Sequence, residues 1–322
     1  MILAKKTLAA ITEQFALDGG AKFRKYLGKV IPHMADAYRA KEEGARTHLG
    51  ASKIGEECPR ALYYSFHWAG EDPRPDNYDK KGNLVETGAE NKARMQRLWN
   101  RGHVEEARFI ALMLTIGCRV VQQDSDGKQL RFAMHAGHYS GSMDGIGIGC
   151  PDVPEGVKVL LEFKTYNDKR FKDLVNNGVA ISDEKYYVQC QQYMGKFGLR
   201  WTLFLAVNKN DDTLHGELLE YRPEVARQYE DRALSIITAQ KPPQKIRGAS
   251  SGFFRCRFCD FGKLCHLGRA PAINCRTCQF SQAVLESDAD GKGIWRCTRY
   301  KTNLTKEQQI EGCEGYVRNR EI

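Results

Sequence analysis

Two carboxylates and a lysine are the residues of this chain whose types and spacing best suit chemistry. Glu162 and Lys164 lie two positions apart in the segment VKVLLEFKTY. The segment predicts a β-strand, in which alternate side chains point to the same face, so these two side chains lie together. A charged pair inside an otherwise apolar strand is costly unless something charged binds there. Asp144 precedes this strand in GSMDGIG, and a hairpin between the two segments can place its carboxylate beside Glu162.

The oxygen atoms near this point suit a divalent cation. Asp144 and Glu162, together with the backbone carbonyl of Phe163, form a hard oxygen site that suits Mg²⁺ or Mn²⁺. Lys164 can orient or help to deprotonate an attacking water, and it can offset negative charge on a scissile phosphate. The set therefore predicts phosphodiester hydrolysis by metal-ion catalysis. For so short a motif, a surface strand whose Glu and Lys form an exposed ion pair is the alternative.

Two helical segments carry further candidates. Gln189 and Tyr193 in YYVQCQQYMGKF have i, i+4 spacing, so one helix face could bring both to the DNA backbone or to the water network at the metal. His103 lies three positions before Glu106 in RGHVEEARFI and could be an additional metal ligand. Polar residues on a solvated helix face are the alternative for both segments.

Alternating helices and strands must position these residues. Periodic patterns bounded by Gly and Pro delimit them. Strands are predicted at residues 118–123, 128–135, 139–148, 157–166, 201–209 and 215–222, and helices at residues 86–116, 182–197 and 223–239. This order predicts an α/β fold. Polar, helix-prone residues precede it, and Pro242 and Pro243 separate it from a cysteine-rich tail.

Composition narrows the class of protein further. Of the 322 residues, 42% are hydrophobic and 28% are charged, which supports a buried core and excludes disorder, collagen and coiled coil. The net charge of +9 favours polyanionic partners, and residues 241–322 carry +7 of it, as expected for a module that contacts phosphates. A solvated basic face is the alternative. The short apolar runs predict no membrane span, and no secretion signal is evident, so we expect a cytosolic protein.

Cysteines cluster toward the C-terminal end of the chain. Seven of the 11 cysteines lie between residues 256 and 313, which indicates metal binding rather than disulfides in a cytosolic protein. A CxxC pair followed by two single cysteines allows a four-thiolate Zn²⁺ site in a small β-rich module. The ligands of this predicted zinc site are Cys275, Cys278, Cys297 and Cys313. The isolated Cys118, Cys150 and Cys190 are expected to be small buried hydrophobic residues.

The ordered set of motifs resembles the PD-(D/E)xK nuclease superfamily and, within it, the RecB-type exonucleases. The resemblance covers about residues 52–265 and rests on GHVEE, GSMDG, LEFKT and QCQQY, the last of which matches a QxxxY motif. It implies a restriction-endonuclease-like core with a mixed central sheet flanked by helices. It also implies a Mg²⁺- or Mn²⁺-dependent deoxyribonuclease that acts on DNA ends or single strands. The implied metal ligands are His103, Asp144, Glu162 and the carbonyl of Phe163, with Lys164 as the catalytic lysine and Gln189 and Tyr193 as substrate-positioning residues.

A second resemblance concerns cysteines on both sides of this core. Cys58 precedes it, and Cys256, Cys259 and Cys265 follow it, as in the CRISPR-associated RecB-like exonucleases and the AddB nuclease domain. In those families four such thiolates hold a [4Fe-4S] cluster, so the resemblance implies one here. Four thiolates also suit Zn²⁺. Because the cysteines lie far apart in the chain, the energy of ligation would contribute to folding.

The expected organisation has three parts: a helical segment at residues 1–50, a nuclease domain at residues 51–268 closed by the cluster, and a zinc-binding module at residues 269–322. Beside the first cysteine, Arg60, Tyr63 and Tyr64 either line the DNA entrance or serve as packing residues. The module could present charge and stacking surfaces to nucleic acid, or it could contact a partner protein. The residues concerned are Arg276, Lys292, Trp295, Arg296, Arg299, Tyr300 and Lys301.

Missing motifs bear on the remaining function classes. The chain contains no GxxxxGK[ST] motif, so we expect no ATP hydrolysis, and any helicase or recombination partner would be a separate protein. By resemblance, the DNA substrate belongs to recombination, repair or phage DNA processing, the last in a bacterial host cytoplasm. The competing class is a non-catalytic DNA-binding or scaffold protein built on a nuclease fold. The joint presence of Asp144, Glu162 and Lys164 argues against it, since losing any one would disable the site.

Overall fold

The chain forms two compact units, each assembled from segments that are distant in sequence. A computed structural model describes residues 1–34, 45–71, 76–286 and 292–322. Unit 1 consists of residues 1–42, 94–132 and 142–227, and unit 2 consists of residues 43–93, 133–141 and 228–322. Part of the predicted N-terminal helical segment, residues 35–44, lies outside the described residues. The domain boundaries at residues 50 and 268 stay predictions.

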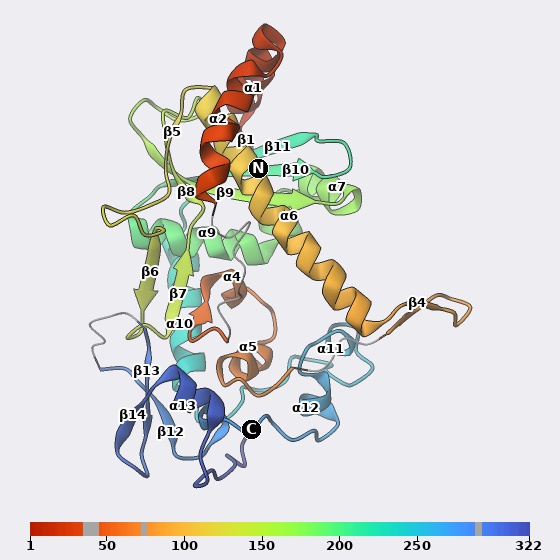
Figure 1. The fold of residues 1–322 in the computed structure, drawn as a ribbon, viewed down its shortest axis with the longest axis vertical. Helices are drawn as coiled ribbons and strands as arrows, with labels where there is room; N and C mark the ends of the chain where they lie inside the picture. The colour runs from red at the N-terminus through yellow and green to blue at the C-terminus, as the bar shows by residue number, and fades with distance from the viewer. Residues whose placement is uncertain (35–44, 72–75, 287–291) are drawn as a thin grey trace. The chain divides into compact units, whose positions relative to one another are not determined.

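A six-stranded sheet organises unit 1 (Figure 1). Its strand order is β1-β11-β10-β9-β8-β5, with β9 and β10 parallel and the other neighbours antiparallel. The strands are β1 (Ile2–Leu3), β5 (Arg119–Val121), β8 (Gly145–Ile148), β9 (Lys158–Tyr166), β10 (Trp201–Asn208) and β11 (Leu214–Glu220). The predicted α/β fold with a mixed central sheet is therefore confirmed. The two-residue edge strand β1 was too short to be predicted from its sequence pattern.

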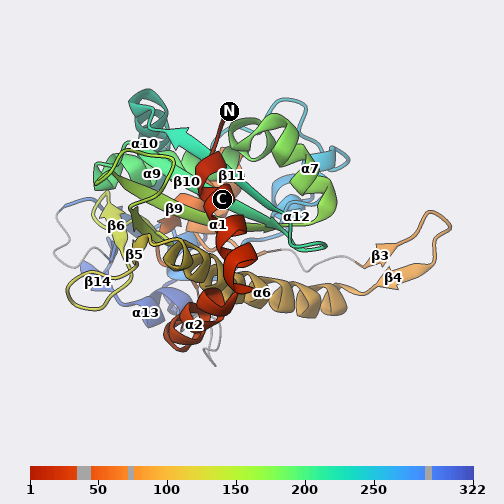
Figure 2. The same cartoon turned by 90° about the horizontal axis from the view of Figure 1, so that it is seen from above.

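Helices cover both faces of this sheet (Figures 1 and 2). The helices α1 and α6 lie on one face, where α1 is followed by α2, and α7 and α9 lie on the other. Their bounds are α1 (Lys5–Asp18), α2 (Ala21–Val30), α6 (Gly88–Thr115), α7 (Asp168–Asn177), α8 (Val179–Ser182) and α9 (Glu184–Phe197), with a 3₁₀ turn at Ile31–His33. No helix in the described part of the chain is both long and apolar enough to span a bilayer.

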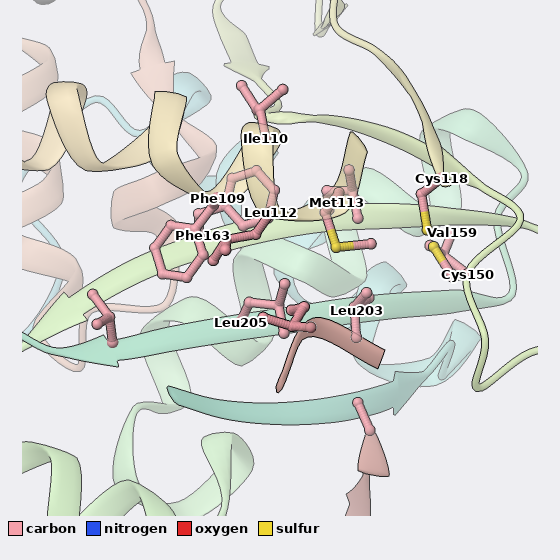
Figure 3. Packing of buried hydrophobic residues seen from close by; sticks show 14 of the residues in the cluster. Phe109, Ile110, Leu112, Met113, Cys118, Cys150, Val159, Phe163, Leu203 and Leu205 are labelled. Atoms are coloured by element: carbon pink, nitrogen blue, oxygen red, sulfur yellow. The ribbon is translucent and has the colours of Figure 1, made fainter. Parts of the chain in front are cut away.

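The main hydrophobic core of unit 1 lies between α6 and the sheet (Figure 3). Because side chains alternate along a strand, Val159, Leu161 and Phe163 of β9 all point into this core. The ring of Phe109 from α6 stacks on Phe163, with ring centroids 5.0 Å apart and an interplanar angle of 7°. The same alternation turns Glu162 to the opposite face of the sheet, where α9 lies.

Helix α7 was not predicted, although its ends carry ordinary signals. The side chain of Asn167 caps the helix by accepting a hydrogen bond from the Arg170 backbone N–H at 2.9 Å. Gly178 ends it with a positive φ of 74°, which glycine adopts without steric cost. The segment DKRFKDLVNN is highly charged, and only Phe171 and Leu174 pack the helix onto the sheet. Two apolar residues among so many charged ones gave too weak a hydrophobic pattern to predict a helix.

Unit 2 consists of short elements and small sheets. One sheet has the strand order β2-β7-β6. The strands β3 and β4 form a separate two-stranded hairpin, which leads into α6 (Figure 2). The bounds are β2 (Leu49–Gly50), α4 (Ala51–Ile54), α5 (Pro59–Phe66), β3 (Asn77–Tyr78), β4 (Leu84–Glu86), β6 (Arg131–Met134), β7 (Tyr139–Ser142), α10 (Pro223–Thr238), α11 (Phe254–Arg257) and α12 (Gly262–His266).

The C-terminal part of unit 2 contains a three-stranded antiparallel sheet, as expected of a β-rich module. Its elements are a 3₁₀ turn (Cys275–Thr277), β12 (Ser281–Val284), β13 (Ile294–Cys297), β14 (Thr302–Leu304) and α13 (Lys306–Glu311). Elsewhere in the chain, Cys118, Cys150 and Cys190 are buried, and their expected role as small buried residues is confirmed.

The expectation that Arg276 and Trp295 present charge and a stacking face to nucleic acid is wrong. Their exposed fractions are only 2% and 1%. The guanidinium of Arg276 lies 3.7 Å from the ring centre of Trp68 and 4.7 Å from that of Trp295. It donates hydrogen bonds to the backbone carbonyls of Phe66 and Thr47, at 2.8 and 2.9 Å. A cation packed between aromatic rings and carbonyls stabilises the interior of unit 2 and cannot reach a partner.

Candidate active site

Pairing of β8 with β9 brings Asp144 beside Glu162. Gly145 is the antiparallel partner of Leu161, so the residue that precedes β8 lies next to the middle of β9. Oδ2 of Asp144 accepts a hydrogen bond from the backbone N–H of Phe163 at 2.9 Å. A Cβ atom at Gly145 would lie 3.2 Å from the carbonyl oxygen of Val121, so glycine allows the neighbouring strand to approach closely here.

Glu162 and Lys164 form an ion pair on the face of β9 that is turned away from the hydrophobic core. The Glu162 side chain is fully buried, and that of Lys164 is 19% exposed. Nζ of Lys164 donates to Oε1 of Glu162 and also to the carbonyl oxygen of Phe163, the latter at 3.0 Å. The alternative of an exposed surface pair is therefore wrong for these two residues.

Helix α9 brings Gln189 to the Glu162 carboxylate and Tyr193 to the segment that carries Asp144. Nε2 of Gln189 donates to Oε1 of Glu162 at 3.1 Å, and the Tyr193 hydroxyl donates to the backbone carbonyl of Ser142 at 2.6 Å. Both side chains are buried, with exposed fractions of 6% and 2%. The i, i+4 spacing placed them on one face as predicted, and that face points inward rather than to solvent.

Burial and charge act together on the ionisation of the pair. Burial raises the pKa of Glu162, the Lys164 ammonium lowers it, and the nearby Asp144 carboxylate raises it again, so that it lies at about 7. Burial alone would lower the pKa of Lys164, but the carboxylates of Glu162 and Asp144 outweigh this effect and raise it well above its ordinary value. Lys164 is therefore an ammonium at neutral pH.

Two buried polar atoms at this point have no hydrogen-bond partner among the described residues. They are Oε2 of Glu162 and Oε1 of Gln189. A buried oxygen acceptor without a donor is unfavourable and favours binding of a cation. Together with the Asp144 carboxylate and the Phe163 carbonyl, these atoms form a set of oxygen ligands of the kind that Mg²⁺ or Mn²⁺ prefers.

His103 is not brought into this group. It lies on α6, partly exposed. No set of three or more His, Cys, Asp or Glu side chains in residues 1–34, 45–71, 76–286 and 292–322 is arranged to hold a metal ion. The carboxylates of Asp144 and Glu162 thus meet without a third such ligand, and the Lys164 ammonium takes the position beside Oε1 of Glu162.

Tyr186 also belongs to this site, although it was not among the residues predicted from the sequence. The Lys164 ammonium nitrogen lies 4.7 Å from the centre of its ring, which is cation–π distance. Tyr186 lies three positions before Gln189 on α9 and therefore shares its helix face. Extending the Gln189 and Tyr193 pattern back by one turn would have found it.

The four cysteines expected to hold a cluster line one cavity in unit 2. Cys58, Cys256, Cys259 and Cys265 share its wall with basic side chains that include Lys245. Burial raises the pKa of Cys259 to about 11, and the neighbouring thiols of Cys58 and Cys256 contribute to that shift. The sulfurs are thus near one another, although they do not have the arrangement of a metal site.

The second cysteine set lines a separate cavity in the C-terminal part of unit 2. Cys275, Cys278, Cys297 and Cys313 surround it together with Tyr300. The pKa of Cys275 is raised to about 11 by burial and then by the thiols of Cys313, Cys278 and Cys297. These sulfurs likewise do not form a ready metal-binding group in the described chain.

The residues after Cys58 serve packing. Tyr63 and Tyr64 have exposed fractions of 0% and 3%, so neither ring can line a DNA entrance. Tyr64 packs on Phe261 with centroids 5.7 Å apart, and the guanidinium of Arg60 donates to the carbonyl of Pro243. Of the two roles that the sequence left open, packing is the one that the structure supports.

No protein-family model and no curated protein sequence matches this chain. Among solved structures, the alkaline exonuclease LHK-Exo from Laribacter hongkongensis is similar at a TM-score of 0.38 and 15% identity, over 60% of this chain and 87% of that chain. LHK-Exo in complex with dAMP gives a TM-score of 0.35 at 15% identity, over 59% and 86%. SSO0001 gives 0.35 at 10% identity, over 76% and 97%. Likeness at this level does not establish an activity.

Proposed function

We propose that this chain is a divalent-metal-dependent deoxyribonuclease of the PD-(D/E)xK type that acts as an exonuclease on DNA ends or single strands. One observation carries the proposal: Asp144 and Glu162 from adjacent strands meet beside Lys164, in a buried position where a carboxylate oxygen has no partner. A structural ion pair would not need a second carboxylate and an unpartnered oxygen at the same point.

The chain's own residues would divide the work. Asp144, Glu162 and the Phe163 carbonyl would hold the cation, which supplies Lewis-acid activation of a water and of the scissile phosphate. Lys164 would hold Glu162 in place and offset negative charge on the phosphate. Gln189 would orient Glu162 through the hydrogen bond it donates.

Tyr193 and His103 would act less directly at the site. Tyr193 would fix the end of the Asp144-bearing segment through its bond to the Ser142 carbonyl. His103, in the middle of α6, stays a proposed additional ligand, and its imidazole would have to lie closer to the two carboxylates than it does here.

Cleavage of labelled DNA with Mg²⁺ or Mn²⁺ tests this proposal. The wild type should degrade linear single strands, whereas Asp144→Ala and Lys164→Ala should not. Closed circular single-stranded DNA should stay intact if the action is exonucleolytic. Cleavage that persists in both variants would remove the assignment.

The second candidate is a non-catalytic DNA-binding or scaffold protein with the same fold. The observation that favours it is that, within the residues that the structure describes, no third His, Cys, Asp or Glu side chain joins Asp144 and Glu162 in a metal-binding group. Tight DNA binding without cleavage in Mg²⁺ or Mn²⁺, by a wild type that retains its bound metals, would support this candidate against the nuclease.

We also propose that Cys58, Cys256, Cys259 and Cys265 hold a [4Fe-4S] cluster. All four line one cavity, and the basic side chains of Arg60 and Lys245 line it too, which would offset the negative charge of a thiolate-bound cluster. A cluster here would join α5 to the α11 and α12 segment and would thereby stabilise unit 2.

For the second set, Cys275, Cys278, Cys297 and Cys313, we propose a structural Zn²⁺. Four thiols that line one small cavity suit tetrahedral zinc. The sheet of β12, β13 and β14 has strands of only three or four residues, and such short strands need additional cross-linking to be stable.

A further inference from the structure

Two phenylalanine rings are exposed in the cysteine-bearing segment of unit 2. Phe254 and Phe258 have exposed fractions of 74% and 57%, and Leu267 nearby has 66%. The two rings pack edge to face, with centroids 5.6 Å apart. Exposing large apolar side chains together is unfavourable in water and marks an interaction surface.

Basic side chains outnumber acidic ones in the segment that carries these rings, although Arg255 is paired with Glu57. Residues 241–269 contain seven Lys and Arg residues and a single acidic residue, Asp260. The guanidinium of Arg257 lies 5.2 Å from the ring centre of Phe258. Lys263 is exposed on the same segment. Exposed aromatic rings interleaved with basic side chains suit a partner that offers both flat apolar faces and negative charge.

A large groove lies against this surface. Its volume is about 800 Å³, and its lining includes Tyr78, Asn91, Arg257, Phe258 and Lys263, together with the carboxylates of Asp76 and Asp260. The ring of Tyr78 is 56% exposed and lies on the β3 strand. Amide, phenol and hydroxyl groups in the lining can form hydrogen bonds with the edges of unpaired bases, which a duplex would not present.

We propose that this surface, formed by Phe254, Arg257, Phe258 and Lys263, binds single-stranded DNA. Bases stack on the two rings, and Arg257 and Lys263 meet the phosphates. A duplex fits less well, because its bases are already stacked and cannot cover the rings. The proposal rests on the proposed function and deepens it, since it names the single strand as the form of DNA that the chain engages.

Fluorescence anisotropy without added divalent metal tests the surface separately from catalysis. The full chain, with its bound metals and in an Asp144→Asn background, is titrated into labelled oligodeoxythymidylate and into a blunt duplex. The variant Phe254→Ala/Phe258→Ala should weaken oligodeoxythymidylate binding by about tenfold or more, because base–aromatic stacking contributes strongly to binding of single strands. Its duplex affinity should change much less.

Two matched variants guard against loss of folding. Phe254→Trp/Phe258→Trp keeps the stacking faces and should retain or strengthen binding. Ile181→Ala removes an apolar side chain that is 76% exposed in unit 1, and it should leave binding unchanged.

Arg257→Gln should reduce the dependence of binding on salt by roughly one phosphate contact.

Unchanged oligodeoxythymidylate affinity in the double alanine variant would overturn the proposal. So would an equal loss for the duplex, or a loss that the tryptophan variant shares. Because no cleavage is measured, a failed nuclease assignment would leave these binding results intact, and a failed surface would leave cleavage by the wild type intact.

Discussion

The ammonium nitrogen of Lys164 lies 4.7 Å from the centre of the Tyr186 ring. The lysine comes from β9 and the tyrosine from α9, so this contact and the bond from Gln189 to Glu162 both link the helix to the same charged pair. Tyr186 therefore limits the positions that the Lys164 side chain can take. In the proposed nuclease it is a positioning residue that acts through the lysine.

Replacing Tyr186 should change the rate of the chemical step more than substrate binding. Tyr186→Leu should lower kcat by up to about thirtyfold with little change in KM, because a desolvated cation–π contact is worth about 2 kcal/mol. Tyr186→Phe keeps the ring and should retain most of the activity. Steady-state kinetics on linear single-stranded DNA measure both values. Equal losses in the two variants would show that the ring does not act through Lys164.

Much of this site could be predicted from local spacing alone. Strand alternation placed Glu162 and Lys164 on the same face of β9, and helix periodicity placed Gln189 and Tyr193 on the same face of α9. The hairpin between the Asp144 segment and β9 then brought the carboxylates together. These relationships depend on residues that are close in sequence or on adjacent strands, which is why the sequence pattern was sufficient.

Residues whose surroundings come from distant segments could not be predicted. Arg276 is surrounded by side chains from α5 and β13 and by carbonyls near β2, and nothing in the sequence of its own turn distinguishes it from an exposed arginine. The segments of unit 1 and unit 2 alternate along the chain. A division of the sequence into consecutive domains therefore could not predict these contacts.

Arg276 should make a large contribution to the stability of unit 2. Arg276→Ala removes the cation from between Trp68 and Trp295 and leaves the Phe66 and Thr47 carbonyls without their donor. The free energy of unfolding should fall by about 3 kcal/mol or more, since each buried polar group left unsatisfied costs about 1–3 kcal/mol. Urea unfolding followed by tryptophan fluorescence measures this.

The neighbouring exposed Arg296 supplies the control for that measurement. Arg296→Ala should change the free energy of unfolding by no more than about 0.5 kcal/mol, as is usual for surface substitutions. If the two variants unfold at the same urea concentration, the buried cation does not stabilise unit 2.

His67 should make the stability of unit 2 depend on pH. Burial lowers its pKa to about 3; a bond with the Tyr63 carbonyl opposes this shift, and the Arg276 charge adds to it. The unfolded chain binds a proton near pH 6.5 and the folded chain does not, so stability is fully present above that pH and falls as the pH drops toward 3.

The measurement is the urea midpoint at about pH 7.5 and about pH 5. Between these values the His67 contribution should fall by about 2 kcal/mol. His67→Gln cannot gain a proton in this range and should lose that part of the pH dependence. A wild-type slope that His67→Gln reproduces in full would contradict the assignment.

Metal content should separate the two cysteine sets. Purified without oxygen, the wild type should be brown and should contain about four irons and one zinc per chain. Cys58→Ser should lose iron and keep zinc, whereas Cys275→Ser should lose zinc and keep iron. Cys190→Ala, in a buried cysteine outside both sets, should keep both metals. Elemental analysis that finds two zincs and no iron would overturn the cluster.

The most direct test is the single-turnover cleavage rate of Glu162→Gln, which keeps the side-chain shape but removes the negative charge at the meeting point of Asp144, Lys164 and Gln189. The wild type should cleave linear single-stranded DNA with Mg²⁺ or Mn²⁺. The variant should be slower by more than about 100-fold, because loss of a ligand should exceed the roughly 10- to 100-fold cost of losing an outer partner of a ligand. Both should bind DNA equally well. A variant that cleaves at the wild-type rate would contradict the proposed function.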